Sequence, residues 1–391
     1  MSSRARRIAI PLAGLMAIGL TAGTVSSAAA GTAGTATSTA AATTTSSSTA
    51  RSDVVSRNAA TPAEQAVRFW TPDRVKRATD HNDGLDLTTK GLKRAGGETP
   101  DGPSGSVPPI GAEKAKSTKS KQVNLPNTVG RVFFTLPKAD PRNPKNWRYC
   151  SATSVQGKYR NLVATSAHCV YDTKKNTFYD NWVFIPSYWD GDTAWTGKAP
   201  YGIYAAKTFN AHDDFVVKED YDYDYAFVSV YNGIKVDWEK AGKRWRWTVK
   251  NVGRLGDNVG GQGFTWNRST KLNVFSFGYP AGQHPDGDRP YTGRTMKWCY
   301  GKTKPMPESK KYNLQEHFGV KCAFTAGASG GPLLVNYNSA ARTGYLVGVN
   351  SVAWDTDGND RYDHISSPYF NGDTYKVYKA AANRWTGNMP R

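Results

Sequence analysis

The chain has 391 residues, 38% of them hydrophobic, and carries a formal net charge of +19. This length excludes one small domain and fits a processed precursor with one sizeable folded domain. Its lysines and arginines are scattered along the whole chain rather than gathered in one stretch, so the charge does not predict a nucleic-acid partner.

The first 30 residues have the pattern of a secretory signal peptide. Three arginines precede an apolar run at residues 8–20, and three alanines at 28–30 offer a cleavage site. The apolar run is shorter than the roughly 20 residues needed to cross a bilayer, which disfavours the alternative of a retained membrane anchor. We therefore expect a secreted, extracellular protein whose mature form does not bind a membrane.

Residues 31–125 are expected to precede the folded domain. Residues 31–50 are almost wholly Ala, Thr, Ser and Gly, and such a stretch cannot bury enough apolar surface to order itself. Apolar residues recur at partly helical spacing between Ala63 and Ala78. Prolines and glycines at 100–109 and lysines at 114–121 then mark an exposed linker that proteases can cut. We interpret 31–125 as a pro-region with a linker; a tail without a chaperoning role is the alternative.

From residue 126 to 391 the pattern changes to short apolar strands separated by turns. Many short strands without long helices between them predict an all-β barrel or sandwich. One helix is expected at the end, where Tyr375, Tyr378, Ala382 and Trp385 recur at roughly helical spacing behind Asp373, a candidate N-cap. The expected strands include Val132–Phe134, Asn161–Thr165, Trp182–Ile185, Tyr225–Val230, Val274–Gly278 and Tyr345–Val349.

Trp245 and Trp247 alternate with Arg244 and Arg246. Such a pattern could form a stacking surface for nucleic acid. It is more typical of one exposed strand of a sheet, because successive side chains of a strand point to opposite faces. We predict a strand here and no nucleic-acid partner.

The four cysteines are Cys150, Cys169, Cys299 and Cys322. An even number in a secreted chain predicts two disulfides, for which three pairings are possible. A zinc site is the alternative, but no two cysteines have the C-x-x-C spacing. We expect no metal.

Three segments carry residues with catalytic chemistry: Thr165–Cys169 (TSAHC), Asp222–Val228 (DYDYAFV) and Gly327–Pro332 (GASGGP). A serine hydroxyl is a poor nucleophile, so an imidazole must take its proton, and a buried carboxylate holds that imidazole in the right tautomer. Glycines beside the serine leave room for the substrate and let backbone amides bind an oxyanion. The order along the chain is His168, Asp224, Ser329.

These motifs resemble those of trypsin/chymotrypsin-like secreted bacterial serine peptidases, and the Gly278–Gly282 and Trp298–Gly301 segments are similar to the branch related to glutamyl endopeptidases. The resemblance covers roughly Val129 to Trp385. It implies that 126–391 is a peptidase domain with two antiparallel six-stranded β-barrels and a C-terminal helix. It also implies disulfides Cys150–Cys169 and Cys299–Cys322, protein or peptide substrates, no cofactor and a monomer.

The resemblance further assigns roles to individual residues. His168, Asp224 and Ser329 would form the catalytic triad, and the amides of Gly327 and Ser329 the oxyanion hole. Ala323, Asn350 and Ser351 would bind substrate, with an uncharged or small residue before the cut bond. Ala328 stands where the family has an aspartate that receives the new N-terminus on activation, so the pro-region is expected to act by assisting folding or by blocking the cleft.

Three alternatives remain beside this interpretation. The aspartates at 213, 214, 220 and 222 crowd the same stretch as Asp224 and could be read as a calcium loop. Gly327-x-Ser329-x-Gly331 also satisfies the elbow of lipases and esterases, although residues 332–335 look like a strand. A non-catalytic homologue could bind protein or cell-wall polymer.

We interpret five histidines as surface, structural or pro-region residues: His81, His212, His284, His317 and His364.

Overall fold

The structure, a computed structural model, describes residues 53–82, 86–88, 92, 100–111, 123–190, 199–241 and 244–390, without the side chains of 86 and 237–247. The expected signal peptide at 1–30, the tract at 31–50 and the lysines at 114–121 lie outside the described residues. All described residues belong to one unit, Arg51–Arg391.

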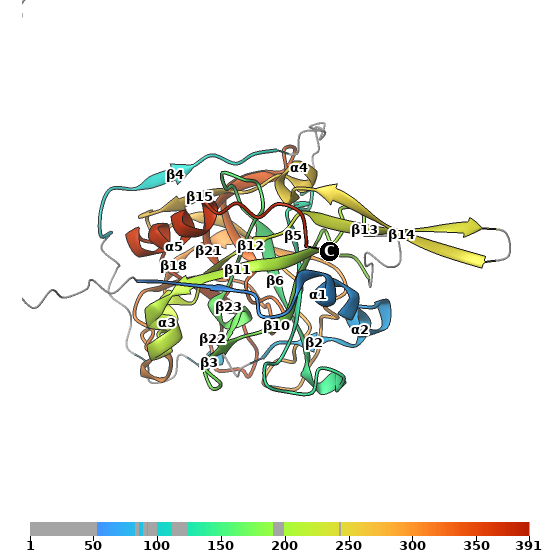
Figure 1. Ribbon diagram of the computed structural model, residues 1–391. Coiled ribbons are helices and arrows are strands. Elements are labelled where there is room, and N and C mark those ends of the chain that lie inside the picture. The colour runs from blue at the N-terminus through green and yellow to red at the C-terminus, as the bar shows by residue number, and fades with distance from the viewer. Residues whose placement is uncertain are drawn as a thin grey trace, which may run out of the picture. The chain divides into compact units, whose positions relative to one another are not determined.

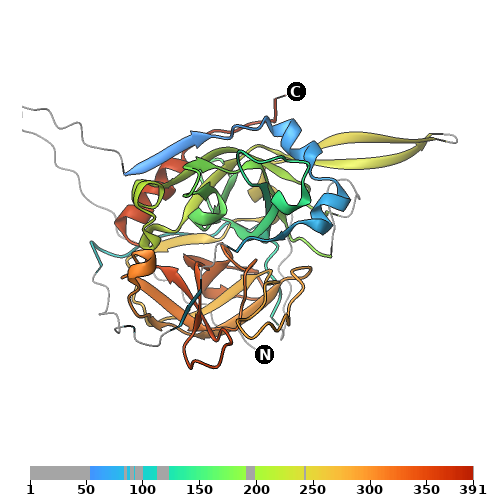
Figure 2. The same cartoon turned by 90° about the horizontal axis from the view of Figure 1, so that it is seen from below.

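Six antiparallel strands close into a barrel, drawn mainly in green in Figure 2. The barrel is closed because the strand at 204–212 pairs on one side with the strand at 180–186 and on the other side with the strand at 226–230. Alternate residues of the strand at 129–135 point to opposite sides: Val132 and Phe134 belong to one apolar cluster, Val129 and Phe133 to another. In spatial order the strands are β11 (Tyr204–His212), β10 (Asp180–Pro186), β5 (Val129–Thr135), β6 (Trp147–Ser154), β7 (Leu162–Thr165) and β12 (Ala226–Val230).

A second β body follows, drawn in orange to red in Figure 2. Its strands form two sheets, which the disulfide Cys299–Cys322 joins and between which an apolar cluster packs. One sheet has the order β17 (Lys297–Lys302), β16 (Asn273–Gly278), β20 (Pro332–Asn338), β21 (Thr343–Val349) and β15 (Gly263–Trp266). The other has the order β18 (Lys304–Pro305), β19 (His317–Lys321), β23 (His364–Pro368) and β22 (Val352–Asp355).

The predicted β class and the six predicted strands are confirmed, because every one of them falls on a strand of these two bodies. The predicted strand at 244–247 is also present. It lies in β14 (Arg244–Gly253), which pairs with β13 (Gly233–Ala241) in a long hairpin that projects from the rest of the unit (Figure 1). A small hairpin joins β8 (Tyr171–Asp172) to β9 (Thr177–Phe178).

The predicted C-terminal helix is α5 (Gly372–Ala382), but its cap differs from the prediction. Asn371, not Asp373, caps it: the Asn371 side chain accepts from the Thr374 amide at 3.1 Å, and the Thr374 hydroxyl accepts from the Asn371 amide at 3.2 Å. Asp373 instead pairs with Lys376 at 2.7 Å. Trp385 lies beyond the helix end and is exposed.

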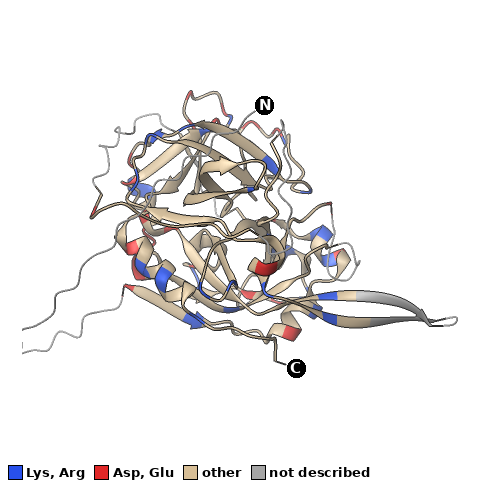
Figure 3. Cartoon of the chain, turned by 90° about the horizontal axis from the view of Figure 1, so that it is seen from above, with Lys and Arg blue, Asp and Glu red and all other residues tan. Residues whose placement is uncertain are grey.

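The other helices among the described residues are short. They are α1 (Ala63–Phe69), α2 (Pro72–Arg77), α3 (Asp213–Lys218), α4 (Leu255–Val259), and the 3-10 turns η1 (Pro144–Asn146), η2 (Ala167–Cys169), η4 (Tyr221–Tyr223) and η5 (Lys310–Tyr312). In the described ranges, no helix has both the length and the apolar character needed to span a membrane. Basic and acidic residues are spread over the surface of the unit (Figure 3).

The residues ahead of the first barrel pack on both β bodies. The helical pattern predicted between Ala63 and Ala78 is confirmed by α1 and α2. Trp70, at the end of α1, has no exposed surface and donates its indole N–H to the Asn181 carbonyl at 2.6 Å. Four strands of this segment join the sheets: β1 (Val54–Asn58) pairs with β11, β2 (Thr79–Asp80) with β6, β3 (Asp86–Thr88) with β22, and β4 (Gly105–Val107) with β15.

Candidate active site

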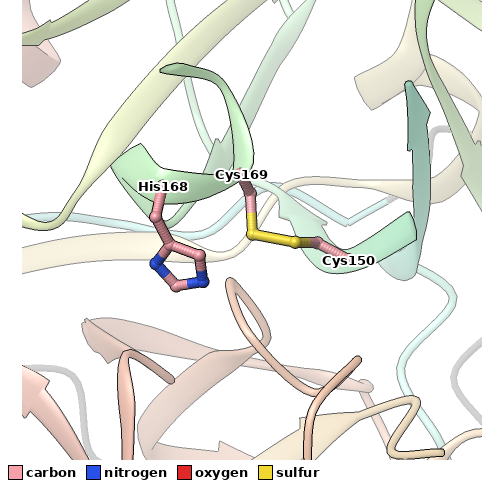
Figure 4. A group of neighbouring side chains, drawn as sticks. All are labelled: Cys150, His168 and Cys169. Atoms are coloured by element: carbon pink, nitrogen blue, oxygen red, sulfur yellow. A yellow bond between two sulfur atoms is a disulfide. The ribbon is translucent and has the colours of Figure 1, made fainter. Parts of the chain in front are cut away.

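His168 is held by a turn that follows directly from the barrel. The buried strand β7 ends at Thr165, and η2 carries His168 and Cys169. The disulfide Cys150–Cys169 ties this turn to β6 (Figure 4). Cys150, His168 and Cys169 lie close enough together to suggest a metal site. Both sulfur atoms are consumed by the disulfide, however, and a metal would require free thiolates.

Asp224 lies directly behind His168 and has no exposed surface. Its Oδ2 is 2.7 Å from His168 Nδ1, and its Oδ1 accepts the His168 backbone N–H at 2.9 Å. The Ser351 hydroxyl donates to Oδ2 at 2.6 Å. The carboxylate therefore fixes the imidazole by both its ring and its backbone, and His168 Nδ1 carries a proton in this arrangement because it faces an acceptor.

The neighbouring aspartates have other partners. Asp213 and Asp214 begin α3, where the His212 ring nitrogen Nδ1 accepts the Asp214 amide at 3.2 Å. Asp220 caps η4 by accepting the Asp222 amide at 3.0 Å. Asp222 accepts the backbone N–H groups of residues 315 and 316, and burial raises its pKa to about 7. Of the five aspartates in this stretch, the structure places Asp224 against His168.

The turn that carries Ser329 packs against the end of β7. The Ser166 hydroxyl and the Gly330 amide both donate to the Asn350 carbonyl, at 2.7 and 2.8 Å. Gly330 has a φ of +79°, and a Cβ there would collide with the Thr165 hydroxyl and lie 3.0 Å from the Ser166 amide. A glycine is therefore required at 330, and the close packing brings the serine turn to the strand that positions His168.

Two backbone amides near Ser329 make no hydrogen bond to a carbonyl of the described chain. The amides of Ala328, Gly330 and Gly331 each donate to a backbone carbonyl. Within the described residues, those of Gly327 and Ser329 donate to none. Gly327 has a φ of +95° and lies close to the Tyr279 carbonyl, so a side chain there would not fit. Two such amides beside a serine form the arrangement that binds an oxyanion.

Two solved structures align with the chain over nearly their whole length. The protease Anisep from Arthrobacter nicotinovorans is 25% identical, with 67% of this chain and 98% of that chain covered and a TM-score of 0.50. A thermostable serine protease, AL20, from an extremophilic microorganism is 22% identical, with 66% and 98% covered and a TM-score of 0.50. The chain has the fold of a chymotrypsin-like serine protease. No protein-family model matches the sequence, and the comparison with curated proteins found no match.

The fold of this protease also decides between two readings of the serine motif. The residues after Gly331 form β20, a strand that pairs with β16 and β21. A lipase or esterase elbow would open a helix at this point. The esterase alternative is therefore wrong.

A pocket of about 40 Å³ lies beside Ser329 in the protease. We call it the Ser329 pocket; none of its lining residues is Asp, Glu, Lys or Arg. The Thr325 hydroxyl is buried there and has no hydrogen-bond partner within the described residues. The lining residues are His81, Asn82, Gln283, Phe324, Thr325, Ala326, Ala328, Ser329, Asn350, Ser351, Val352, Ala353, Tyr362 and Ile365.

Two of the three residues expected to bind substrate line this pocket, namely Asn350 and Ser351. The Asn350 side chain is fully engaged by the fold: its Oδ1 accepts from Ser276 at 2.9 Å and its Nδ2 donates to Ala328 at 3.1 Å. Ala323 is exposed and does not line the pocket. Its neighbour Cys322 is tied to the sheet by the disulfide and by a hydrogen bond that its backbone N–H donates to the Asp363 carbonyl at 2.8 Å, and it is Phe324 that turns inward.

The remaining histidines of the protease are structural, with one exception. His212, His284, His317 and His364 are all buried. In His317 both ring nitrogens have partners, Ser366 Oγ at 2.9 Å and the Tyr221 carbonyl at 2.8 Å, and burial lowers its pKa to about 4. The exception is His81, which sequence reasoning assigned to the pro-region. Its ring stacks on that of His168 with centroids 6.1 Å apart, and no local motif marks it.

Proposed function

We propose that the protein is a secreted endopeptidase that cleaves peptide bonds through an acyl-enzyme on Ser329. The observation that carries the proposal is the contact of buried Asp224 with both His168 Nδ1 and the His168 amide. This arrangement leaves the imidazole with Nε2 as its basic atom. The signal-like N-terminus and the two disulfides support secretion.

The proposed mechanism gives each of these groups a role. His168 Nε2 takes the proton of the Ser329 hydroxyl while Ser329 Oγ attacks the peptide carbonyl, and Asp224 stabilises the resulting imidazolium. The amides of Gly327 and Ser329 donate to the oxyanion; one such donor typically lowers the barrier by about 3 kcal/mol. His168 then gives its proton to the leaving amine, and water releases the acyl group by the same path.

The Ser329 pocket would hold the side chain before the cut bond. Because its described lining carries no Asp, Glu, Lys or Arg and includes the apolar side chains of Phe324 and Ile365, it suits an uncharged side chain. The unpartnered Thr325 hydroxyl offers one hydrogen bond to a polar one. We therefore expect peptides with a small or uncharged residue at this position to be cleaved faster than those with Asp, Glu, Lys or Arg.

The test is labelling of the processed, purified protein with a fluorophosphonate probe, followed by peptide mapping. We expect one labelled site, Ser329, and loss of labelling in Ser329→Ala and His168→Ala. Ser269→Ala, an exposed serine in the loop after β15, is the matched control and should label like the wild type. A folded, processed protein that does not label would overturn the proposal and favour a non-catalytic binding homologue.

A further inference from the structure

A second pocket lies beside the proposed active site, and its described lining is mainly basic. It has a volume of about 430 Å³, and we call it the basic pocket. One pair of its charged lining residues, Arg294 and Asp190, lies 3.7 Å apart. In the rest of the described lining, three positive charges face one negative charge. These remaining charged residues are Lys76, Asp80, Arg131 and Arg289.

Arg131 differs from the other basic residues of this lining because it is buried. Only 4% of it is exposed, and its guanidinium lies over the Tyr149 ring, 3.3 Å from the ring centroid. Its Nη1 donates to the Gly293 carbonyl at 3.2 Å, whereas its Nε is buried without a hydrogen-bond partner among the described residues. A buried positive charge that is bonded to a neutral carbonyl is costly, and an anion beside it lowers that cost. The basic pocket therefore suits an anionic group.

The chain's own Asp80 shows how this pocket treats a carboxyl group. Burial raises the pKa of Asp80, while the charges of Arg289 and Arg148 act to lower it. The arginines therefore favour the ionised form of a carboxyl group at this place. The volume of about 430 Å³ lies beside Asp80, so there is room for a further acidic side chain.

Tyr149 connects the basic pocket to the turn that carries the nucleophile. Its side chain lines the pocket, and its hydroxyl donates to the Tyr279 carbonyl at 3.3 Å. A Cβ on Gly327, whose amide is proposed to bind the oxyanion, would lie 2.8 Å from the Tyr149 hydroxyl. Two residues further along β6, the Ser151 amide donates to the Ser329 carbonyl at 2.8 Å. Because an extended peptide advances about 3.3 Å per residue, the pocket lies within about three substrate residues of the reacting carbonyl.

The Cys150–Cys169 disulfide indicates on which side of the cut bond the pocket lies. Tyr149 directly precedes Cys150, and the disulfide to Cys169 lies beside His168 (Figure 4). His168 must give its proton to the leaving amine, so the leaving peptide passes on this side. The Ser329 pocket, which would hold the residue before the cut bond, shares no described lining residue with the basic pocket. The two pockets therefore suit residues on opposite sides of the cut bond.

We propose that the basic pocket binds an acidic side chain of the substrate on the leaving-group side of the cut bond, with Arg131 and Arg289 as specificity-determining residues. This inference rests on the proposed endopeptidase function and adds a second substrate requirement to it. Guanidinium groups bind carboxylates by charge-assisted hydrogen bonds, which are about twice as strong as neutral ones. The enzyme then selects peptides with Asp or Glu among the first three residues after the cut, whereas the Ser329 pocket selects an uncharged residue before it.

The test measures hydrolysis of pairs of peptides by the processed enzyme. Both peptides of a pair have a small uncharged residue before the cut bond, and they differ only by Glu or Gln at the first, second or third place after it. Mass spectrometry of the products verifies where the peptide is cut. We expect kcat/KM to be at least about 10-fold higher for the Glu peptide of one or more pairs. In Arg131→Gln and in Arg289→Gln this ratio should fall below about threefold.

Because both peptides are measured with the same variant, a partial loss of folded enzyme cancels in the ratio. Arg384→Gln is the matched control, since Arg384 is an exposed arginine after α5 that does not line the pocket; it should keep the wild-type ratio. Thermal melting verifies folding, and Arg289→Gln, a change at an exposed residue, carries the test if Arg131→Gln does not fold.

The outcomes separate this inference from the proposed function. Equal hydrolysis of the Glu and Gln peptides, or a Glu preference that persists in the folded arginine variants, would overturn the role of the basic pocket and leave the endopeptidase intact. Loss of the preference in Arg384→Gln as well would also overturn it, since net charge would then explain the effect. Hydrolysis of no peptide, together with no fluorophosphonate labelling of Ser329, would overturn both.

Discussion

Asp222 and Asp224 are two residues apart and both lie in the interior, but their carboxylates meet different partners. Asp224 accepts hydrogen bonds from the His168 ring and amide. Asp222 accepts the backbone N–H groups of Gln315 and Glu316. The pair allows the effect of a lost charge on catalysis to be separated from its effect on folding.

Asp224→Asn is expected to lower kcat by about 10⁴-fold, because an amide cannot hold His168 in the tautomer that leaves Nε2 basic. Asp222→Asn keeps an oxygen that accepts both backbone N–H groups, and its activity should stay within about threefold of the wild type. Steady-state hydrolysis of a peptide substrate measures both, with circular dichroism to verify folding. Similar activity losses in the two variants would contradict the assigned role of Asp224.

At this scale, local pattern predicts some residues and not others. Asp224 could be chosen from the sequence because it directly precedes an apolar strand, β12, whose place in the barrel is fixed. The family resemblance, which works by position along the chain, implies that Ala323 binds substrate. Position along the chain could not show that Cys322, fixed to Cys299, leaves Ala323 outside and turns Phe324 inward. His81 could not be predicted, because its neighbour His168 lies on a different part of the fold.

The two disulfides close similar lengths of chain in different elements. Cys150 and Cys169 are 19 residues apart and join β6 to the turn that carries His168. Cys299 and Cys322 are 23 residues apart and join the two sheets of the second body; Cys322 lies seven residues before Ser329, outside the turn that carries it. Both pairings agree with those implied by the family resemblance.

Removing either disulfide with paired Cys→Ser changes should cost about 3 kcal/mol of unfolding free energy, since the closed loops are of similar length. The effect on catalysis should differ. Loss of Cys150–Cys169 frees the His168 turn and should lower kcat at least about 10-fold, whereas loss of Cys299–Cys322 should leave kcat within about threefold. Urea titration and peptide hydrolysis measure the two effects. A kcat loss of the same size in both double variants would show that η2 is held without its disulfide.

Elements differ in how far the sequence predicts them. The barrel strands are apolar runs bounded by turns, and these were found. β3 and β4 have three residues each and lie in polar sequence. They exist because β22 and β15 offer an edge, so their partners, distant in sequence, decide their conformation.

For the unit as a whole, the N-terminal segment has two roles that are expected to be coupled. Its first part builds structure: β1 extends the barrel sheet along β11, and Trp70 is buried against β10. Its later part contributes β2, which is followed by His81 beside His168, and β3, which pairs with β22. A cut in the sequence at 114–121 would leave the first part bound by these contacts, so we expect the segment to dissociate more slowly than it is cut.

Trp70 and Trp385 test whether this segment folds with the rest of the unit. Trp70→Ala removes a side chain with no exposed surface and should lower the unfolding free energy by about 3–5 kcal/mol. Trp385→Ala removes one that is 62% exposed and should change it by less than about 0.5 kcal/mol. Both changes are made in the Ser329→Ala chain, to prevent self-digestion, and unfolding in urea is followed by circular dichroism. A single, shifted transition for Trp70→Ala indicates one cooperative unit, because the barrel then loses stability with the segment. A separate early transition, with the main one unmoved, would instead show that the segment docks on a barrel that is already stable without it.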